Sequence, residues 1–208
     1  MFNRTKLQKK EGEKPTEIEE ECAKALTAFE KSNADLQKDL RMVFLNSVKE
    51  CEFEGDDGSS RKYILIKIPF RSMQFYKKVA QKTIEHLEAK FNWPVIVVVN
   101  RTIDSTRKIT HSSQKRPRSR TLKAVHAEIL ADCVVPSSVV GRRSRVSQQT
   151  GTTAVVYLDP LDKMLVEDKL DAMANAYAAL TTHKITLEFN KPTSFQKKKL
   201  EKINERRN

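Results

Sequence analysis

Basic and hydroxyl side chains are interleaved between residues 100 and 123, where the residue types are best suited to bind a ligand. Lys and Arg contact phosphates, Ser and Thr add hydrogen bonds to phosphate or ribose, and the Arg guanidinium can hold one phosphate through two parallel bonds. A single acid, Asp104, interrupts the series. The basic residues are Arg101, Arg107, Lys108, Lys115, Arg116, Arg118, Arg120 and Lys123. We predict that they contact RNA; a solvated run of charge or a nuclear localisation signal is the alternative.

Two of these residues occupy a special position. Arg118 and Arg120 lie where the basic loop meets a helix that is expected to begin near Thr121, with Leu122, Val125 and Ile129 on its apolar face. Basic side chains on a rigid backbone segment lose less entropy on binding than those on a flexible loop. We therefore expect Arg118 and Arg120 to contribute more to binding than Arg206 and Arg207 near the C-terminus.

Two further basic groups lie closer to the C-terminus. The first is Arg142, Arg143 and Arg145, and the second is Lys197, Lys198 and Lys199. In a strand Arg143 and Arg145 share a face, and we predict phosphate contacts for the first group, although charge also protects a strand edge from aggregation. For the second group we predict a segment that is disordered alone and ordered on RNA; a segment that stays disordered is the alternative.

The positive charge is concentrated in the second half of the chain. The net charge is +12, and residues 1–99 hold 18 Lys and Arg against 16 acids, whereas residues 100–208 hold 21 against 11. A binding surface concentrates charge in this way, and nucleic acid is the expected polyanion. Few aromatic residues lie among the basic ones, His111 and Phe195 being the nearest. We therefore expect recognition of RNA shape and backbone rather than stacking of bases.

The sequence lacks the motifs of common enzyme classes. Its five glycines form no phosphate-binding loop, no GxGxxG and no GxSxG. His126 and Cys133 can share a helix face, but a core thiol beside an ordinary histidine is a better interpretation than a nucleophile and its base. A third feature, Glu50, Glu52 and Glu54 on one strand face, is interpreted as solvated rather than as a cation site. We predict no catalytic residue, no metal, no cofactor and no small-molecule substrate.

Cysteine usage and hydropathy indicate the compartment. Cys22, Cys51 and Cys133 are far apart and show no CxxC spacing, so we expect a reducing, intracellular compartment and no structural zinc. No apolar run approaches ~20 residues, and the N-terminus has no signal-peptide pattern. We therefore expect no membrane contact.

Hydrophobic periodicity predicts an α+β fold, in which helices pack on a mixed β-sheet in the order ααββαβ, loop, αββαβ. Helices are expected within 16–29, 36–40, 72–91, 122–133 and 160–180, and strands within 50–54, 63–68, 94–99, 142–147, 152–158 and 185–189. We expect an N-terminal tail at 1–14, one domain at 15–189 with its basic loop at 100–120, and a basic C-terminal extension at 190–208. The two halves share a ββαβ order without a visible repeat in their sequences.

The centre of the basic region matches a pattern found in a known family. It consists of Lys115-Arg116-Pro117-Arg118-Ser119-Arg120-Thr121-Leu122, Ala124-Val125-His126, Ile129-Leu130, Val135-Pro136, Val139-Val140-Gly141, Arg143 and Arg145. These motifs closely resemble those of the eukaryote-specific family of small-subunit ribosomal protein seven, and similarity of pattern extends over roughly residues 15–189. The resemblance implies an α/β protein that binds small-subunit ribosomal RNA and neighbouring ribosomal proteins. It also implies a role in subunit assembly and precursor-RNA processing, with assembly in the nucleolus and residence in cytoplasmic ribosomes.

Two alternatives remain open. A nucleolar RNA-processing or chromatin factor can carry the same domain. A basic nuclease or RNA-modifying enzyme needs clustered acids for a metal, or a paired His and Lys. Asp56-Asp57, Asp159 and Asp162 fall in expected turns or helix starts, where capping accounts for them.

The turn 148–151 and the segment from Lys191 onward depart from the family's pattern, so the resemblance does not indicate their contacts.

Overall fold

The computed structural model describes residues 6–9, 12–55, 59–105, 116–148 and 151–205. The chain divides into two compact units, Met1–Val135 and Pro136–Asn208. Each unit combines helices with a three-stranded mixed sheet, so the predicted α+β class is confirmed, with two sheets in place of one. Within the described ranges, no helix is long and apolar enough to cross a membrane.

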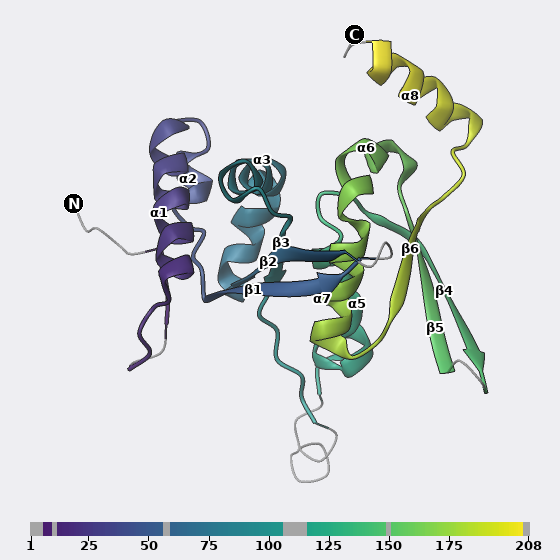
Figure 1. The fold of residues 1–208 in the computed structure, drawn as a ribbon, viewed down its shortest axis with the longest axis horizontal. Helices are drawn as coiled ribbons and strands as arrows, with labels where there is room; N and C mark the ends of the chain where they lie inside the picture. The colour runs from purple at the N-terminus through teal and green to yellow at the C-terminus, as the bar shows by residue number, and fades with distance from the viewer. Residues whose placement is uncertain (1–5, 10–11, 56–58, 106–115, 149–150, 206–208) are drawn as a thin grey trace. The chain divides into compact units, whose positions relative to one another are not determined.

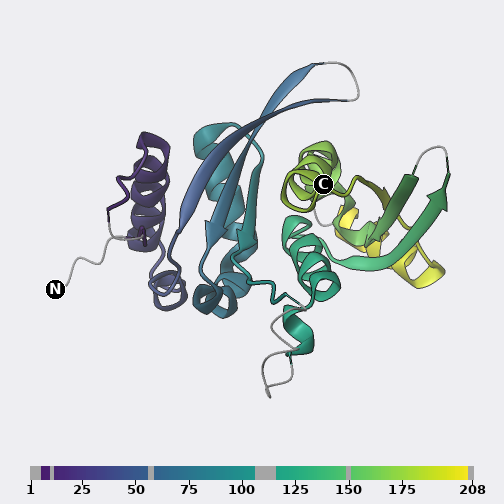
Figure 2. The same ribbon diagram turned by 90° about the horizontal axis from the view of Figure 1, so that it is seen from below.

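The first unit is built on a β-hairpin and a parallel third strand (Figure 1). Its elements are α1 (Glu17–Ser32), α2 (Gln37–Leu40), β1 (Ser47–Glu54), β2 (Ser60–Ile68), η1 (Phe70–Ser72), α3 (Met73–Phe91), β3 (Val95–Val99), η2 (Arg118–Arg120) and α5 (Leu122–Cys133). β1 and β2 are antiparallel, whereas β2 and β3 are parallel and pair only from Ile64 onward. The outer half of the hairpin therefore extends beyond β3, as Figure 2 shows.

The sheet is buried on both faces where β2 pairs with β3. Ile64, Ile66 and Ile68 share one hydrophobic cluster with residues of α1 and α3, which lie side by side (Figures 1 and 2). Leu65 and Ile96 point to the opposite face and are also buried, and α5 contacts β3. All five residues of β3 are buried, as its short β-branched run predicts.

Part of the expected N-terminal tail belongs to the first unit. The ammonium of the buried Lys6 lies 2.6 Å from a carboxylate oxygen of Glu30 and donates to the carbonyl of Leu40. Leu7 and Leu45 form an isolated parallel bridge. Charged residues without periodicity give no hydrophobic pattern, so the sequence did not predict this attachment.

The second unit contains the edge strand that carries the arginine group. Its elements are β4 (Val139–Ser147), β5 (Gly151–Leu158), η3 (Pro160–Asp162), α6 (Lys163–Val166), η4 (Glu167–Lys169), α7 (Leu170–Thr181), β6 (Ile185–Phe189) and α8 (Ser194–Glu205). Val156, Leu158, Val166 and Tyr177 are fully buried and form the centre of its core. β4 pairs with β5 alone and is exposed along most of its length.

The two units repeat one topology. In each, an antiparallel hairpin leads through a 3-10 turn and a helix to a parallel third strand. Both crossover helices end at a residue in the left-handed region, Asn92 (φ 56°) and Thr182 (φ 62°). Asn92 and Thr182 are as far apart in the sequence as Val95 and Ile185, which are the first residues of β3 and β6. The ββαβ order shared by the two halves of the sequence is thus a structural repeat.

Helix α8 replaces the disordered extension that we predicted after residue 190. The Thr193 N–H donates to Oε1 of Gln196 at 2.9 Å, and the Gln196 N–H donates to the Thr193 hydroxyl at 3.4 Å. These reciprocal bonds form a capping box, whose Thr-x-x-Gln pattern is visible in the sequence. The lysines that follow favour a helix by propensity.

Candidate nucleic-acid interface

The Arg-rich segment ends in an ordered junction between η2 and α5. The Arg120 N–H donates to the carbonyl of Pro117 at 3.1 Å, and the Thr121 hydroxyl donates to the carbonyl of Arg118 at 2.8 Å. Thr121 is extended (φ −76°, ψ 150°) and is the N-cap of α5, but its side chain caps no backbone N–H. Local hydrogen bonds therefore define the direction of the backbone at the junction, which supports the rigid backbone segment expected there.

The anchors of α5 differ partly from the prediction. Val125, Leu130 and Cys133 are at most 3% exposed and hold the helix on the first unit. Leu122, predicted on the apolar face, is 51% exposed. A first-turn residue lies at the edge of the packed surface, where the apolar period alone does not ensure burial.

Most of the described basic side chains near this junction are accessible. Arg118, Arg120 and Lys123 are exposed, and the half-buried Arg116 donates to the carbonyl of Arg120 at 3.0 Å. Arg120 lies 3.5 Å from a carboxylate oxygen of Asp104, but its side chain is still 56% exposed. An exposed pair of this kind contributes only ~0–1 kcal/mol, so its guanidinium remains available to a phosphate. Three predicted contacts, Arg107, Lys108 and Lys115, lie outside the described residues.

Arg101 has a different place from the one we predicted. Its side chain is 7% exposed and donates to both carboxylate oxygens of Asp132 and to Glu128. Asp132 also accepts the N–H of Val99, the last residue of β3. Arg101 therefore ties the end of β3 to α5, and its buried guanidinium is engaged within the fold rather than presented to RNA.

The arginines of β4 form a second exposed group. Arg142, Arg143 and Arg145 are all exposed, and the last two face Val155 and Thr153 of β5 across the sheet. As the strand period predicts, Arg143 and Arg145 share a face. Because β4 is an edge strand, its outer backbone groups have no strand partner within the described part of the second unit.

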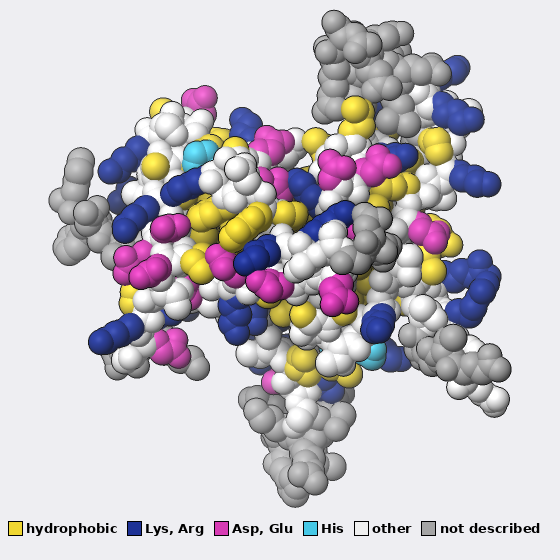
Figure 3. All heavy atoms as spheres, viewed as in Figure 1, with side chains coloured by type: hydrophobic (Ala, Val, Ile, Leu, Met, Phe, Trp, Pro, Cys, Tyr) yellow, Lys and Arg dark blue, Asp and Glu magenta, His cyan; other side chains and the backbone are white. Residues whose placement is uncertain are grey.

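Helix α8 carries the third group. Lys197, Lys198 and Lys199 are exposed on consecutive positions, so they point to different sides of the helix. α8 contacts η3. Dark blue Lys and Arg side chains follow the right edge of the view in Figure 3, where α8, β4 and β5 lie in Figure 1.

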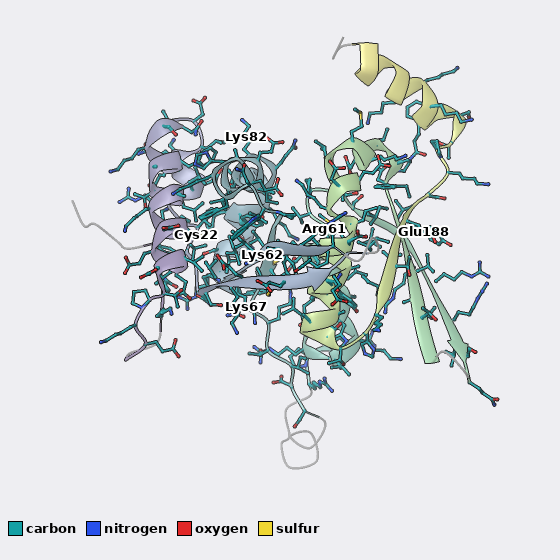
Figure 4. All side chains as sticks on the ribbon, in the orientation of Figure 1. Cys22, Arg61, Lys62, Lys67, Lys82 and Glu188 are labelled. Carbon is teal, nitrogen blue, oxygen red and sulfur yellow. The ribbon has the colours of Figure 1, made fainter. Side chains whose placement is uncertain are left out.

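Lys62 on β2, labelled in Figure 4, is engaged with neighbouring side chains. Its ammonium lies 2.8 Å from a carboxylate oxygen of Glu52 and 5.8 Å from the centroid of the Trp93 ring. The hydrogen bond to Glu52 raises the pKa of Lys62, and the same bond lowers the pKa of Glu52. Glu52 therefore has a cationic partner on its strand face.

Cys133 and clustered acidic residues are the features of the sequence that bear on catalysis. Burial raises the pKa of the Cys133 thiol to about 12, so this cysteine is not a nucleophile at neutral pH. No group of three His, Cys, Asp or Glu in the described ranges has the geometry of a metal site.

The fold brings one aromatic residue to the junction that the sequence did not associate with it. Phe70 is 63% exposed and, with Ser119 and Arg120, lines a pocket of about 550 Å³ in the first unit. Its neighbours in sequence, Pro69 and Arg71, give no sign of this. The only available signal was an apolar residue between a strand and a helix, which also fits burial.

The comparisons with known proteins cover most of the chain. The family model described as ribosomal protein S7e matches residues 6–189, a range that runs from the attached N-terminal segment to the end of β6 and stops before α8. The small ribosomal subunit protein eS7 of Dictyostelium discoideum is 37% identical over 199 residues, 93% of this chain and 99% of that protein. The eS7 proteins of Drosophila melanogaster and Avicennia marina are 35% and 33% identical over 189 residues each, covering 89% and 88% of this chain and 94% and 95% of theirs.

Proposed function

The chain belongs to the ribosomal protein S7e family, and we propose that it binds small-subunit ribosomal RNA through the η2–α5 junction and the arginines of β4. The family is structural and not enzymatic, so the chain is a structural protein of the small ribosomal subunit and resides in ribosomes. This membership excludes the nuclease alternative. The choice of the residues that contact RNA is our inference.

The exposed cations of the junction are the observation that carries this proposal. Arg118, Arg120 and Lys123 are exposed on an ordered backbone. No side chain caps the first turn of α5, so its N–H groups and partial positive charge add to the attraction for a phosphate. A phosphate at this place meets side-chain donors on an ordered backbone together with the backbone donors of the helix terminus.

The other basic groups are proposed as further, separate RNA contacts. Arg142, Arg143 and Arg145 of β4 supply phosphate contacts in the second unit, and the lysines of α8 supply a third set. Residues 15–189 are proposed to act as one RNA-binding module, although the chain forms two compact units. The proposed partners include neighbouring small-subunit proteins, and the proposed roles include nucleolar subunit assembly and precursor-RNA processing.

Protein–RNA crosslinking in purified small subunits tests the proposal. Peptides covering 116–123 and 139–147 are expected to crosslink to small-subunit ribosomal RNA. Peptides of α3, which covers the core of the first unit, serve as the internal comparison. If the chain is recovered in the subunits and neither basic peptide crosslinks more than α3, the proposed surface is wrong.

A further inference from the structure

A pocket of about 550 Å³ lies beside the Arg-rich junction, within the first unit. Its walls come from the start of the α3 segment, the chain that follows β3, and the η2–α5 junction. The lining residues are Phe70, Met73, Asn100, Arg101, Thr102, Ser119, Arg120, Ala124 and Glu128. A volume of this size is in the range of small-molecule and cofactor pockets.

The apolar wall of the pocket includes an exposed phenyl ring that does not pack in the hydrophobic cluster. Phe70 is 63% exposed and lies outside the hydrophobic cluster of the first unit. Met73, beside it, is half-buried and accepts a weak contact from Arg101. An exposed phenyl ring and an accessible guanidinium, that of Arg120, line the same pocket. Aromatic rings and arginine guanidinium groups are the surfaces on which unstacked RNA bases stack.

We propose that this pocket receives one unpaired base of the bound RNA, stacked on Phe70, while Arg118 and Arg120 hold the adjacent phosphates. The inference rests on the proposed RNA-binding function and adds a base-specific site to it. Phosphate contacts fix the position of an RNA without reading its sequence, whereas a base in a pocket can be read.

The polar wall indicates which base fits. Glu128 has a 55% exposed side chain, and one of its carboxylate oxygens lies 3.3 Å from Arg101. Its remaining acceptor capacity faces solvent and suits N–H donors on the edge of a base. Guanine offers two adjacent N–H donors on its Watson–Crick edge, whereas adenine offers one donor beside an acceptor. Guanine is therefore the proposed base.

The charges around the pocket favour RNA over the apolar side chain of a protein partner. A buried apolar anchor would remove Arg120 and Glu128 from water without replacing their hydrogen bonds, which is costly. A nucleotide supplies acceptors to the arginine through its phosphate and donors to the carboxylate through its base. The occupant that satisfies both wall groups is thus a nucleotide.

Binding of the full chain to synthetic RNA hairpins tests the site. Three hairpins share one stem: one has a single extruded guanosine, one an extruded adenosine, and one is fully paired. The unchanged protein is expected to bind the guanosine hairpin about tenfold more tightly than the paired one. Phe70→Ala should abolish this preference while leaving the affinity for the paired hairpin unchanged, and Glu128→Gln should abolish the preference for guanosine over adenosine.

The control is Phe195→Ala, which removes another exposed phenyl ring, 77% exposed and located in the second unit. It should retain every preference, and thermal melts should show that all variants are folded. Equal affinity of the unchanged protein for the bulged and paired hairpins would overturn the base pocket and leave phosphate binding intact. Failure to bind any of the hairpins at low salt would overturn both. A preference that survives Phe70→Ala would place the base elsewhere and also overturn the pocket.

Discussion

Arg101 donates to both carboxylate oxygens of Asp132, and the pair joins the segment after β3 to α5. The two side chains are 7% and 9% exposed, and Asp132 also accepts the Val99 N–H at 3.1 Å. The first arginine of the basic region therefore stabilises the fold that presents the others. The exposed Arg118 provides a matched contrast, because it has the same side chain without this burial.

Replacing Arg101 by Ala should strongly destabilise the protein. The change leaves the carboxylate of Asp132 buried without its cation, and breaking a buried pair in this way costs ~3–5 kcal/mol. Arg118→Ala should change the free energy of unfolding by less than ~0.5 kcal/mol, because it removes only an exposed side chain. Urea denaturation of the three proteins measures both values, and equal stability of the two variants would show that the pair contributes nothing specific.

Glu19 should give the stability a dependence on acid pH. Its buried carboxylate accepts the Thr16 N–H at 2.9 Å and the Val48 N–H at 3.3 Å, and it lies 2.5 Å from the Lys9 ammonium. Burial alone would raise the pKa of Glu19, but the hydrogen bonds from Lys9 and the two backbone groups lower it below the ordinary 4.5. A lowered pKa in the folded state adds stability above the unfolded pKa, and this stability is lost as the pH falls through the folded pKa.

Glu19→Gln should therefore be less stable than the unchanged protein at neutral pH by ~1.5–3 kcal/mol, the range for hydrogen bonds to a charged group. The difference should narrow as the pH falls below the ordinary pKa of 4.5. The exposed Glu21 supplies the control, since Glu21→Gln should run parallel to the unchanged protein. A difference that stays constant across the acid range would contradict the role assigned to the charge.

Thr182→Gly should stabilise the second unit. Thr182 ends α7 with φ 62°, a conformation that is unfavourable for a β-branched residue and free of strain for glycine. We expect a gain of ~1 kcal/mol, partly offset by the greater freedom of glycine in the unfolded chain. Asn92→Gly, at the equivalent position of the first unit, should gain less, because asparagine tolerates this conformation. Thermal melts compare the two, and a larger gain at Asn92 would refute the explanation.

RNA binding by the isolated chain should depend steeply on salt. Neutralising roughly five to eight phosphates releases a similar number of counterions, so affinity should fall by about 10³ or more between low salt and a concentration above physiological. A filter-binding titration with a small-subunit ribosomal RNA fragment measures the slope. A flat response would mean that the exposed cations of the junction and of β4 do not meet phosphates.

The sequence predicted the elements whose local pattern and tertiary environment agree. The Val-rich β3 is buried on both faces, as its β-branched composition indicates, and the Thr16–Glu19 capping box begins α1. The junction at Arg118 and Arg120 was predicted because the basic loop meets a helix whose apolar period begins just after Thr121. Local pattern, pairing and burial point to the same structure at these places.

The features that the sequence did not predict depend on contacts between distant residues. Lys6 forms an ion pair with Glu30, and the sequence around either residue contains no pattern that predicts this pair. In the sequence Arg101 does not differ from its basic neighbours, and only the fold shows that it pairs with Asp132. Phe70 reads as a core residue, and only the fold shows that it lines a pocket with Arg120. The capping box of α8 at Thr193 is different, because its Thr-x-x-Gln pattern is local and is present in the sequence itself.

The central claim is that the cations at the η2–α5 junction attach the protein to the small subunit. The direct measurement expresses tagged variants in cells and determines the share of each that sediments with small subunits and ribosomes. The test variant combines Arg118→Ala with Arg120→Ala. The first control combines Lys77→Ala with Lys82→Ala and so removes two exposed charges from α3. The second control combines Arg206→Ala with Arg207→Ala, at two positions outside the described residues. Each purified variant is also melted.

The account predicts that the Arg118 and Arg120 double variant loses most of its incorporation while melting at the temperature of the unchanged protein, and that the two control pairs incorporate normally. Equal incorporation of all three pairs would contradict the account. A melting temperature that falls together with the incorporation of the first pair would contradict it as well, because the loss would then come from unfolding rather than from missing RNA contacts.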